Sequence, residues 1–313
     1  MPPRKRAAST ALPTLTVHGR FRRYPHDGSN GPFERNPVAK ADTITIDQSG
    51  LPEDTTYARR AETLAKLKPA DCLDRAILIQ TSEHHDQIRA AFKNDKELRA
   101  PLKKKYKGGE FGENIYCSGG DADTLCIGDV LTLVPAARKS GRAAASDSPR
   151  GASNNGTLTL QVSNPRRPCS KVDLAYGKTF GGDGVRAYCA RTGRAGFFVR
   201  VLQPGALIDG AELQVVERPH PQWTLSRVSD LLYGMDSACD NPAGYTLPGT
   251  PNPMGGCRSG GAGKAAVVAK WKGTEAELRE LAGLTALCGY EWRDEFEALL
   301  KVWDEPESRC VVM

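Results

Sequence analysis

The sequence contains no run of about 18 consecutive apolar residues, so we predict no membrane-spanning helix. Its start, MPPRKRAASTALPTL, is basic but has no apolar core, and we therefore expect no secretory signal peptide. The nine cysteines include no C-x-x-C pair, so no zinc site is indicated. An odd number of cysteines without paired spacing favours a reducing compartment. Together these absences predict a cytoplasmic protein.

Aromatic residues are also scarce, at 7% of the chain, and the net charge of +6 is only a modest excess of one sign. Basic residues gather in short runs at residues 4–6 and 103–105. Sites for single-stranded nucleic acid interleave basic side chains with aromatic ones that stack on bases, and these runs do not. We therefore predict no nucleic-acid partner.

The chain does contain many short segments of alternating apolar and polar residues, separated by turns rich in glycine and proline. This spacing is typical of a β-rich, barrel-like domain. Strands are predicted at residues 14–19, 42–47, 74–80, 157–162, 197–202 and 212–217, with two more around a Gly-Asp turn within 125–134. Helices are predicted at residues 55–68, 83–100, 183–191, 224–233, 274–287 and 291–303. The expected fold class is α+β, mainly β.

These elements predict a division of the chain into consecutive segments. We expect a disordered N-terminus at residues 1–13, a β-barrel domain at 14–220, a three-helix unit at 221–304 and a tail at 305–313. Two stretches of low complexity interrupt this order, at residues 136–156 and 240–264. Their small and polar residues cannot build a core, so both are predicted to be loop insertions, the first of them disordered.

The most distinctive stretch is QVSNPRRPCSK, at residues 161–171. Two prolines stiffen its backbone, and its cysteine, Cys169, lies among three cations, Arg166, Arg167 and Lys171. Because nearby positive charge lowers a thiol pKa, Cys169 is predicted to form a thiolate that acts as a nucleophile, a redox group or a soft-metal ligand. The structural alternative is a buried cysteine with solvated arginines beside it.

Four motifs in the order FGENI, IGDVL, LQVSNPRRPC and TGRAGFFVRVLQPG resemble the MOSC family, the domains related to the C-terminal part of the molybdenum-cofactor sulfurase. Within that family the chain is most similar to the YiiM group. That group's C-terminal three-helix unit is matched here by LRELAGL and YEWRDEFEALLKVW. The resemblance extends over most of residues 14–304. It implies a MOSC β-barrel core with a small C-terminal three-helix unit.

The resemblance also implies that the chain binds the molybdenum cofactor, molybdopterin with its metal. Cys169 corresponds to the cysteine of the family's PRxPC motif and would be the protein ligand to molybdenum. The other expected contacts are cations for the phosphate, polar groups for the pterin, a glycine that allows close approach, and a D-R-A strand. They correspond to Arg166, Arg167, Lys171, Arg194, Asn114, Ser163, Gly196, Asp74 and Arg75. Each arginine also has a structural alternative, an ion pair within the fold.

The activity that the resemblance implies is a molybdenum-dependent reduction of small N-hydroxylated substrates, such as N-hydroxylated bases or amidoximes. Electrons would come from a separate flavin- or heme-containing protein, because the sequence shows no flavin, heme or iron–sulfur motif. The family's Gly-x-x-Gly-Asp and His-Gly-Gly segments are replaced here by GLPEDTTY and KLKPADCLDRA. This departure favours one alternative, a non-catalytic cofactor carrier. A second alternative is a thiol redox protein that uses Cys169 directly.

The last four residues, from Cys310, read CVVM and match the C-a-a-X prenylation pattern, in which methionine favours a farnesyl group. The preceding DEPESR is acidic, so the polybasic segment that usually accompanies a single lipid is absent. The pattern predicts lipidation of Cys310 and membrane contact through the prenyl group. The alternative is a chance match.

Overall fold

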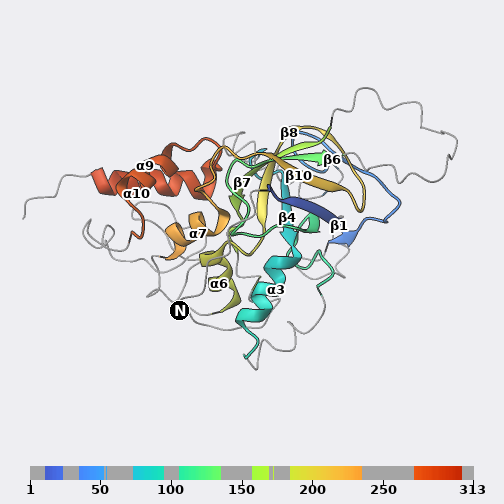
Figure 1. Cartoon of the computed structure of the whole chain (residues 1–313), viewed down its shortest axis with the longest axis horizontal. Coiled ribbons are helices and arrows are strands. Elements are labelled where there is room, and N and C mark those ends of the chain that lie inside the picture. The colour runs from blue at the N-terminus through green and yellow to red at the C-terminus, as the bar shows by residue number, and fades with distance from the viewer. Residues whose placement is uncertain are drawn as a thin grey trace, which may run out of the picture.

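A computed structural model describes residues 11–23, 35–52, 54, 73–94, 106–134, 157–168, 172, 184–234 and 271–304. Figure 1 shows a strand-rich body with helices along one side and at one end. The predicted helix at 55–68, the insertions at 136–156 and 240–264 and the tail at 305–313 lie outside the described residues.

Seven strands of the described chain close into a barrel, in the order β10, β6, β7, β8, β4, β5, β1, and the barrel closes because β1 pairs with both β5 and β10. Of these pairings only β4 with β5 is parallel. The barrel strands are β1 (Thr14–Arg22), β4 (Ile77–Thr81), β5 (Ile115–Ser118), β6 (Val130–Val134), β7 (Thr159–Pro165), β8 (Phe197–Gln203) and β10 (Glu212–Glu217). Closure leaves few unpaired strand edges. The predicted fold class, α+β and mainly β, is confirmed.

Three shorter strands complete the described sheets. The strand β2 (Asn36–Pro37) adds to the end of β1, and β3 (Ile44–Ile46) pairs antiparallel with β9 (Gly205–Leu207). Ile44 and Ile46 are fully buried, while Thr45 between them is exposed, so β3 closes over the barrel core with one face. This is the alternation that the sequence predicted for residues 42–47.

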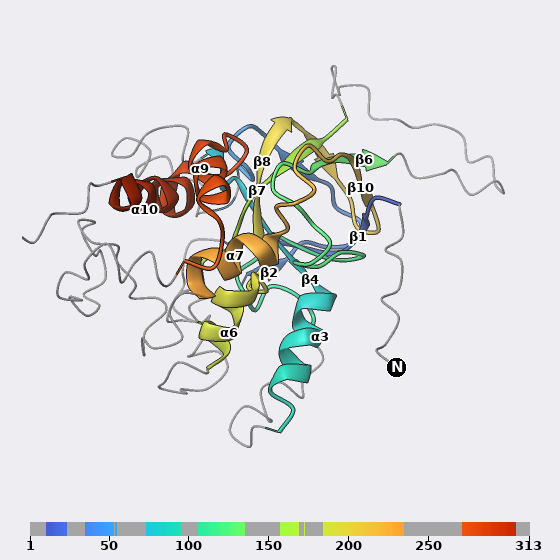
Figure 2. The ribbon, with the colours of Figure 1, turned by 60° about the vertical axis from the view of Figure 1, so that its left-hand side comes forward.

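Helices lie at one end and along one side of the barrel (Figure 2). The helices α3 (Ser82–Ala91) and α6 (Val185–Thr192) lie at the end, and α7 (Leu225–Tyr233) packs on α6. On the side are α9 (Glu275–Gly283), the π-helical turn η2 (Gly289–Arg293) and α10 (Asp294–Asp304). Predicted caps are present: Thr224 accepts from the Arg227 N–H, and Thr274 with Glu277 forms a capping box.

One hydrophobic cluster joins the barrel to the C-terminal helices. Leu160 and Val199 of the barrel belong to the same buried set as Leu231, Trp292 and Phe296 of the helices. Each fully buried side chain of this size contributes about 2 kcal/mol to folding. The helices are therefore packed onto the barrel by the main core, while the segment boundary expected at residue 220 stays a prediction.

Several predicted element bounds were wrong. Only Val130–Val134 forms a strand within 125–134, because the Asp129 carboxylate accepts from the Cys126 N–H and holds the first half as a turn. The strand expected from residue 74 starts at Ile77. The helices expected at 83–100 and 274–287 end at Ala91 and Gly283, and the helix expected at 291–303 starts with the η2 turn. Every helix in the described ranges is too short or too polar to cross a membrane.

Candidate functional site

The strand β7 leads directly into the Arg-Arg-Pro segment at residues 166–168. Pro165, the last residue of β7, pairs with Phe197 of β8, and the Arg166 N–H donates to the Gly196 carbonyl over 2.8 Å. The barrel therefore fixes the point from which the cysteine loop departs. Cys169 and Lys171 lie outside the described residues.

Ser163 forms a bulge in β7 opposite β8. Its buried hydroxyl lies 3.0 Å from the Phe198 carbonyl and 3.0 Å from Asn164 Oδ1. Its own carbonyl accepts from the Cys288 N–H over 3.0 Å. Bulges often occur beside functional sites, where they redirect the chain. Here the bulge ties β7 to the C-terminal helical segment, and the Ser163 hydroxyl is engaged within the fold.

Asn114, at the end of the Gly-Glu-Asn turn, is also engaged internally. Its Oδ1 accepts from the Leu78 N–H over 3.1 Å, and its Nδ2 donates to Asp54 Oδ2 over 3.1 Å. Asp54 is in turn paired with Arg35. The side chain predicted to orient a pterin therefore connects β4 to this buried ion pair.

The Gly-rich turn before Asn114 is held by a buried carboxylate. Glu113 Oε1 accepts from the Gly109 N–H and from the Tyr106 hydroxyl, each over 2.6 Å. Burial raises the pKa of Glu113, and these hydrogen bonds oppose the rise. The Arg166 guanidinium donates to the Phe111 carbonyl of the same turn. The turn and the start of the cysteine loop, distant in sequence, are thus in contact.

Two other candidate arginines face the C-terminal helices. Arg75 Nη1 lies 2.9 Å from Glu291 Oε2, and its guanidinium lies 4.5 Å from the centre of the Phe198 ring. Arg167 Nη1 lies 3.9 Å from Glu295 Oε1, and its guanidinium lies 6.0 Å from the centre of the Tyr233 ring. The following residues are called the Glu295 cluster: Arg75, Arg167, Tyr233, Glu291, Trp292 and Glu295.

Asp74, beside this cluster, has a structural partner. Its Oδ1 lies 3.0 Å from Arg200 Nε, and Arg200 Nη2 donates to the Ala286 carbonyl over 2.9 Å. Asp74 therefore helps to join the start of β4 to β8 and to the segment before η2.

The Glu295 cluster combines a partly exposed rim with a buried interior. The four ion-paired side chains of the rim are 15–25% exposed, whereas Tyr233 and Trp292 are 2% and 1% exposed. Burial raises the pKa of Tyr233. Burial also raises the pKa of Glu295 to about 7, against the opposing effect of Arg167 and with smaller contributions from Glu291 and Asp294. Glu295 is therefore a carboxyl group that can hold or release a proton near neutral pH.

Glu295→Gln is expected to stabilise the fold at pH 8 and to change it little at pH 5. A raised carboxyl pKa means that the folded chain binds the proton more tightly than the unfolded chain. Stability is therefore lost as pH rises from about 4.5 to about 7, and the full cost, roughly 2–4 kcal/mol, is present above that window. Chemical denaturation at both pH values measures it, with the half-exposed Glu297→Gln as control. Equal effects of Glu295→Gln at pH 5 and pH 8 would contradict this expectation.

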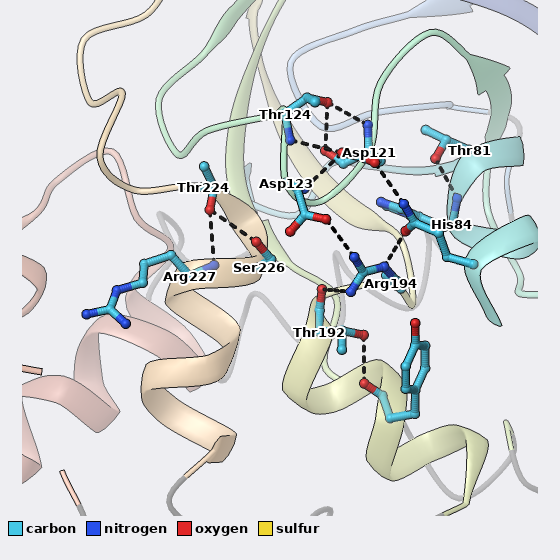
Figure 3. Close-up of polar contacts among 12 residues, drawn as sticks. Thr81, His84, Asp121, Asp123, Thr124, Thr192, Arg194, Thr224, Ser226 and Arg227 are labelled. Carbon is cyan, nitrogen blue, oxygen red and sulfur yellow. Dashed lines mark hydrogen bonds and ion pairs between the residues drawn. The ribbon is translucent and has the colours of Figure 1, made fainter. Parts of the chain in front are cut away.

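Arg194 belongs to a different network, between α3, α6 and the turn after β5 (Figure 3). Its Nη2 lies 2.6 Å from Asp123 Oδ2, its Nε donates to Gln87, and its Nη1 donates to the Thr192 carbonyl over 3.4 Å. The guanidinium lies 5.9 Å from the centre of the Tyr188 ring. Arg194 therefore forms an ion pair within the fold, which was the structural alternative to a cofactor contact.

The structure brings together part of the predicted set and adds residues that the sequence did not indicate. Arg75 and Arg167 meet at the Glu295 cluster, whereas Asn114, Ser163, Asp74 and Arg194 are bonded into the framework. Glu291, Trp292 and Glu295 were recognised only as helix residues. The one available signal was the spacing of Glu291 and Glu295, four residues apart and thus on one face of a helix. Nothing local showed that this face meets two arginines.

The structure tests metal ligation and lipidation only for the residues that it describes. In the described ranges, no three His, Cys, Asp or Glu side chains gather in a way that could hold a metal ion. The expected ligand, Cys169, and the expected lipidation site, Cys310, both lie outside those ranges, so both remain predictions.

The closed barrel and the Arg-Arg-Pro segment that follows β7 can now be compared with known families. Residues 66–214 match the family model described as the MOSC domain. This part of the chain, a little under half of its 313 residues, is similar to the MOSC domain family.

The relatives found among curated proteins are distant. A protein named "Reductase" from Gibberella moniliformis is 26% identical over 159 residues, which are 51% of this chain and 23% of that protein. YflK of Bacillus subtilis is 29% identical over 145 residues, 46% of this chain and 49% of YflK. The chain thus spans about a quarter and about half of these two relatives. YiiM of Escherichia coli is 24% identical over 63% of this chain and 73% of YiiM.

Solved structures share the fold over nearly the whole chain. The crystal structure of YiiM from Geobacillus stearothermophilus aligns with a TM-score of 0.53 at 19% identity, covering 91% of this chain and 99% of that one. YiiM from Escherichia coli aligns with a TM-score of 0.50 at 16% identity, covering 94% and 97%. The MOSC β-barrel with C-terminal helices, expected from the sequence, is confirmed as the fold.

Proposed function

We propose that this protein binds the molybdenum cofactor through Cys169 and reduces N-hydroxylated compounds such as amidoximes and N-hydroxylated bases. The observation that carries the proposal is the placement of the Arg-Arg-Pro segment. It is anchored by the Arg166–Gly196 hydrogen bond, and its Arg167 faces Glu295 of α10. A relative named "Reductase" is consistent with this class of reaction.

The cationic residues of this region suit the negative charge that the cofactor would carry. The cofactor carries a phosphate, which needs cationic partners. Arg167 is 21% exposed, and its 3.9 Å separation from Glu295 is longer than a direct hydrogen bond, so this ion pair is loose. Arg167 can therefore contribute charge to an anionic ligand, and Lys171 is the second cation that we assign to this role. Asn114 and Ser163 would support the site only indirectly, because their side chains already form hydrogen bonds within the fold.

When bound, the cofactor supplies two-electron chemistry that cleaves an N–O bond. For an amidoxime, the balanced reaction converts the N–OH group, two electrons and two protons into an N–H group and water. The electrons would come from a flavin- or heme-containing partner protein. The roles that we assign to this chain are metal ligation by the Cys169 thiolate, phosphate binding by Arg167 and Lys171, and proton holding at Glu295.

The test is made on the full chain purified from a host that makes the molybdenum cofactor. Molybdenum is measured by elemental mass spectrometry, and conversion of benzamidoxime to benzamidine is measured with reduced methyl viologen as electron donor. We expect close to one molybdenum per chain and steady turnover. A protein without molybdenum would overturn the proposal and favour thiol redox chemistry at Cys169. A protein with molybdenum but no turnover would favour the cofactor carrier, the alternative suggested by the departures near residues 50–72.

A further inference from the structure

Three polar atoms of the Glu295 cluster form no hydrogen bond within the structure as described: Tyr233 Oη, Trp292 Nε1 and Glu295 Oε2. A buried polar atom left unpaired destabilises the fold, because it loses its bonds to water. Folded proteins contain few such atoms. Three of the nine such atoms among the described residues lie on these neighbouring side chains, which together form a buried polar site that a ligand could complete.

The aromatic and charged groups of the cluster are arranged in contact. The rings of Tyr233 and Trp292 meet edge to face, with centres 5.7 Å apart. The Arg167 guanidinium lies beside the Tyr233 ring and is paired loosely with Glu295. The cluster therefore offers two donors, one carboxyl group and aromatic walls, which together suit a small, flat, polar molecule.

The backbone beneath the cluster is unusual in the same place. Residues Gly289–Arg293 form a π-helical turn, and Glu291 has a left-handed φ of 67°. A residue other than glycine is strained in this region, and both features concentrate at functional sites. The turn places Glu291 against Arg75 and directs Trp292 and Glu295 toward Tyr233 and Arg167. The strained backbone at Glu291 therefore lies in the segment that brings the residues of this cluster together.

We infer that the Glu295 cluster is the substrate-binding surface for the N–C–N edge of amidine-type compounds, with the Glu295 carboxyl group bonding adjacent N–H groups and Tyr233 and Trp292 completing the contacts. Amidoximes and N-hydroxylated aminobases share this N–C–N skeleton. The amidine product donates two parallel N–H bonds to a carboxylate, whereas an amidoxime donates one N–H bond from its amino group. The Trp292 N–H can only donate, whereas the Tyr233 hydroxyl can donate or accept. The inference rests on the proposed function and names its substrate class.

The charges around Glu295 predict how binding depends on pH. Arg167 faces it from the loop after β7, Tyr233 from α7, and Glu291 and Asp294 from its own segment, while Arg75 pairs with Glu291. Since the pKa of Glu295 is about 7, its carboxylate fraction rises about tenfold between pH 6 and pH 8. A cationic amidine requires the carboxylate form, so its binding strengthens as pH rises through 7.

Benzamidine, the product of benzamidoxime reduction, is the probe. Its affinity for the full-length protein is measured by calorimetry at pH 6 and pH 8. We expect wild type to bind several-fold to about tenfold more tightly at pH 8. Glu295→Gln is expected to bind about tenfold or more weakly at pH 8 and to show no change with pH, since a charge-assisted hydrogen bond is lost. Glu297→Gln, on the same helix and half-exposed, is expected to match wild type.

Tyr233→Phe provides a second variant that removes only the buried hydroxyl, and several-fold weaker binding is expected. Equal affinity in wild type and Glu295→Gln, or no binding of benzamidine to wild type, would overturn the inference. Binding requires no turnover, so the two proposals fail separately. Glu295-dependent binding in a protein without molybdenum would leave this site standing and refute the reductase. Turnover and binding that are both unaffected by Glu295→Gln would refute this site and the proton role of Glu295, and would leave the molybdenum-dependent reductase standing.

Discussion

Cys169→Ala is expected to yield a folded protein without molybdenum and without reductase activity. The substitution removes the thiolate, which is the soft ligand that we propose for molybdenum. The cations near Cys169 in the sequence favour the thiolate over the thiol. The fold should persist, because the barrel anchors the loop through the backbone of Arg166 rather than through the cysteine. Elemental mass spectrometry measures the metal, and thermal unfolding of the same samples measures the fold.

Cys126→Ala is the matched control. Its thiol is buried, and burial, with a smaller contribution from Asp129, raises its pKa to about 11, so it is not a thiolate at neutral pH. Its Sγ lies 3.6 Å from the Pro221 carbonyl, which is a structural contact. We expect this variant to retain its metal. Equal molybdenum in wild type and Cys169→Ala would refute the assigned ligand, and loss of metal in both variants would show that folding, not ligation, was disturbed.

Gly196→Ala is expected to destabilise the protein by about 3 kcal/mol or more, in the presence or absence of cofactor. Gly196 has a φ of 98°, which costs a residue with a side chain about 1–3 kcal/mol. A Cβ at this position would also lie 2.6 Å from the Ile79 carbonyl oxygen, so β4 and β8 would have to separate. Because the Gly196 carbonyl accepts from the Arg166 N–H, the cysteine loop should be displaced too.

Gly210→Ala separates backbone strain from the close contact. Gly210 has a φ of 74°, but a Cβ there would meet no atom within 4 Å. The Gly210→Ala substitution should therefore lower the free energy of unfolding by only about 1 kcal/mol, the usual difference between alanine and glycine in a left-handed conformation. Urea unfolding of both variants measures the difference. Similar losses of stability in the two variants would show that the close contact with the Ile79 carbonyl of β4 does not restrict residue 196. Close approach of the cofactor would then be the remaining reason for a glycine at this position.

Much of the fold was predictable because its determinants are local. Alternation fixes which side chains of β3, β10 and the first half of β7 are buried, and short turn-rich connections favour a barrel. The caps at Thr224 and Thr274 were recognisable because a cap depends on residues three positions apart. The end of α3 was placed too late, because helical spacing continues in sequence past Ala91, where Lys93 and Asn94 are exposed. The end of α9 was also placed too late, because Leu284 turns to an extended backbone although it and Leu287 stay buried.

The site was less predictable because its chemistry depends on contacts between distant segments. Asn114 and Ser163 have side chains that could orient a ligand, yet their neighbours in space, Leu78, Asp54 and Phe198, use their hydrogen bonds. Glu295, in contrast, looked like one of many exposed helix acids. Only packing of α10 on the barrel buries it beside Arg167 and raises its pKa.

The sequence by itself determined a mainly β fold with motifs that resemble the MOSC family, and it predicted a cationic, proline-stiffened loop around Cys169, because motif order and alternation are properties of neighbouring residues. Only the tertiary structure decided which polar side chains are used by the framework and which are left without internal partners. The physical reason is that burial and hydrogen-bond satisfaction depend on segments far apart in the chain, such as residues 75, 167, 233 and 295.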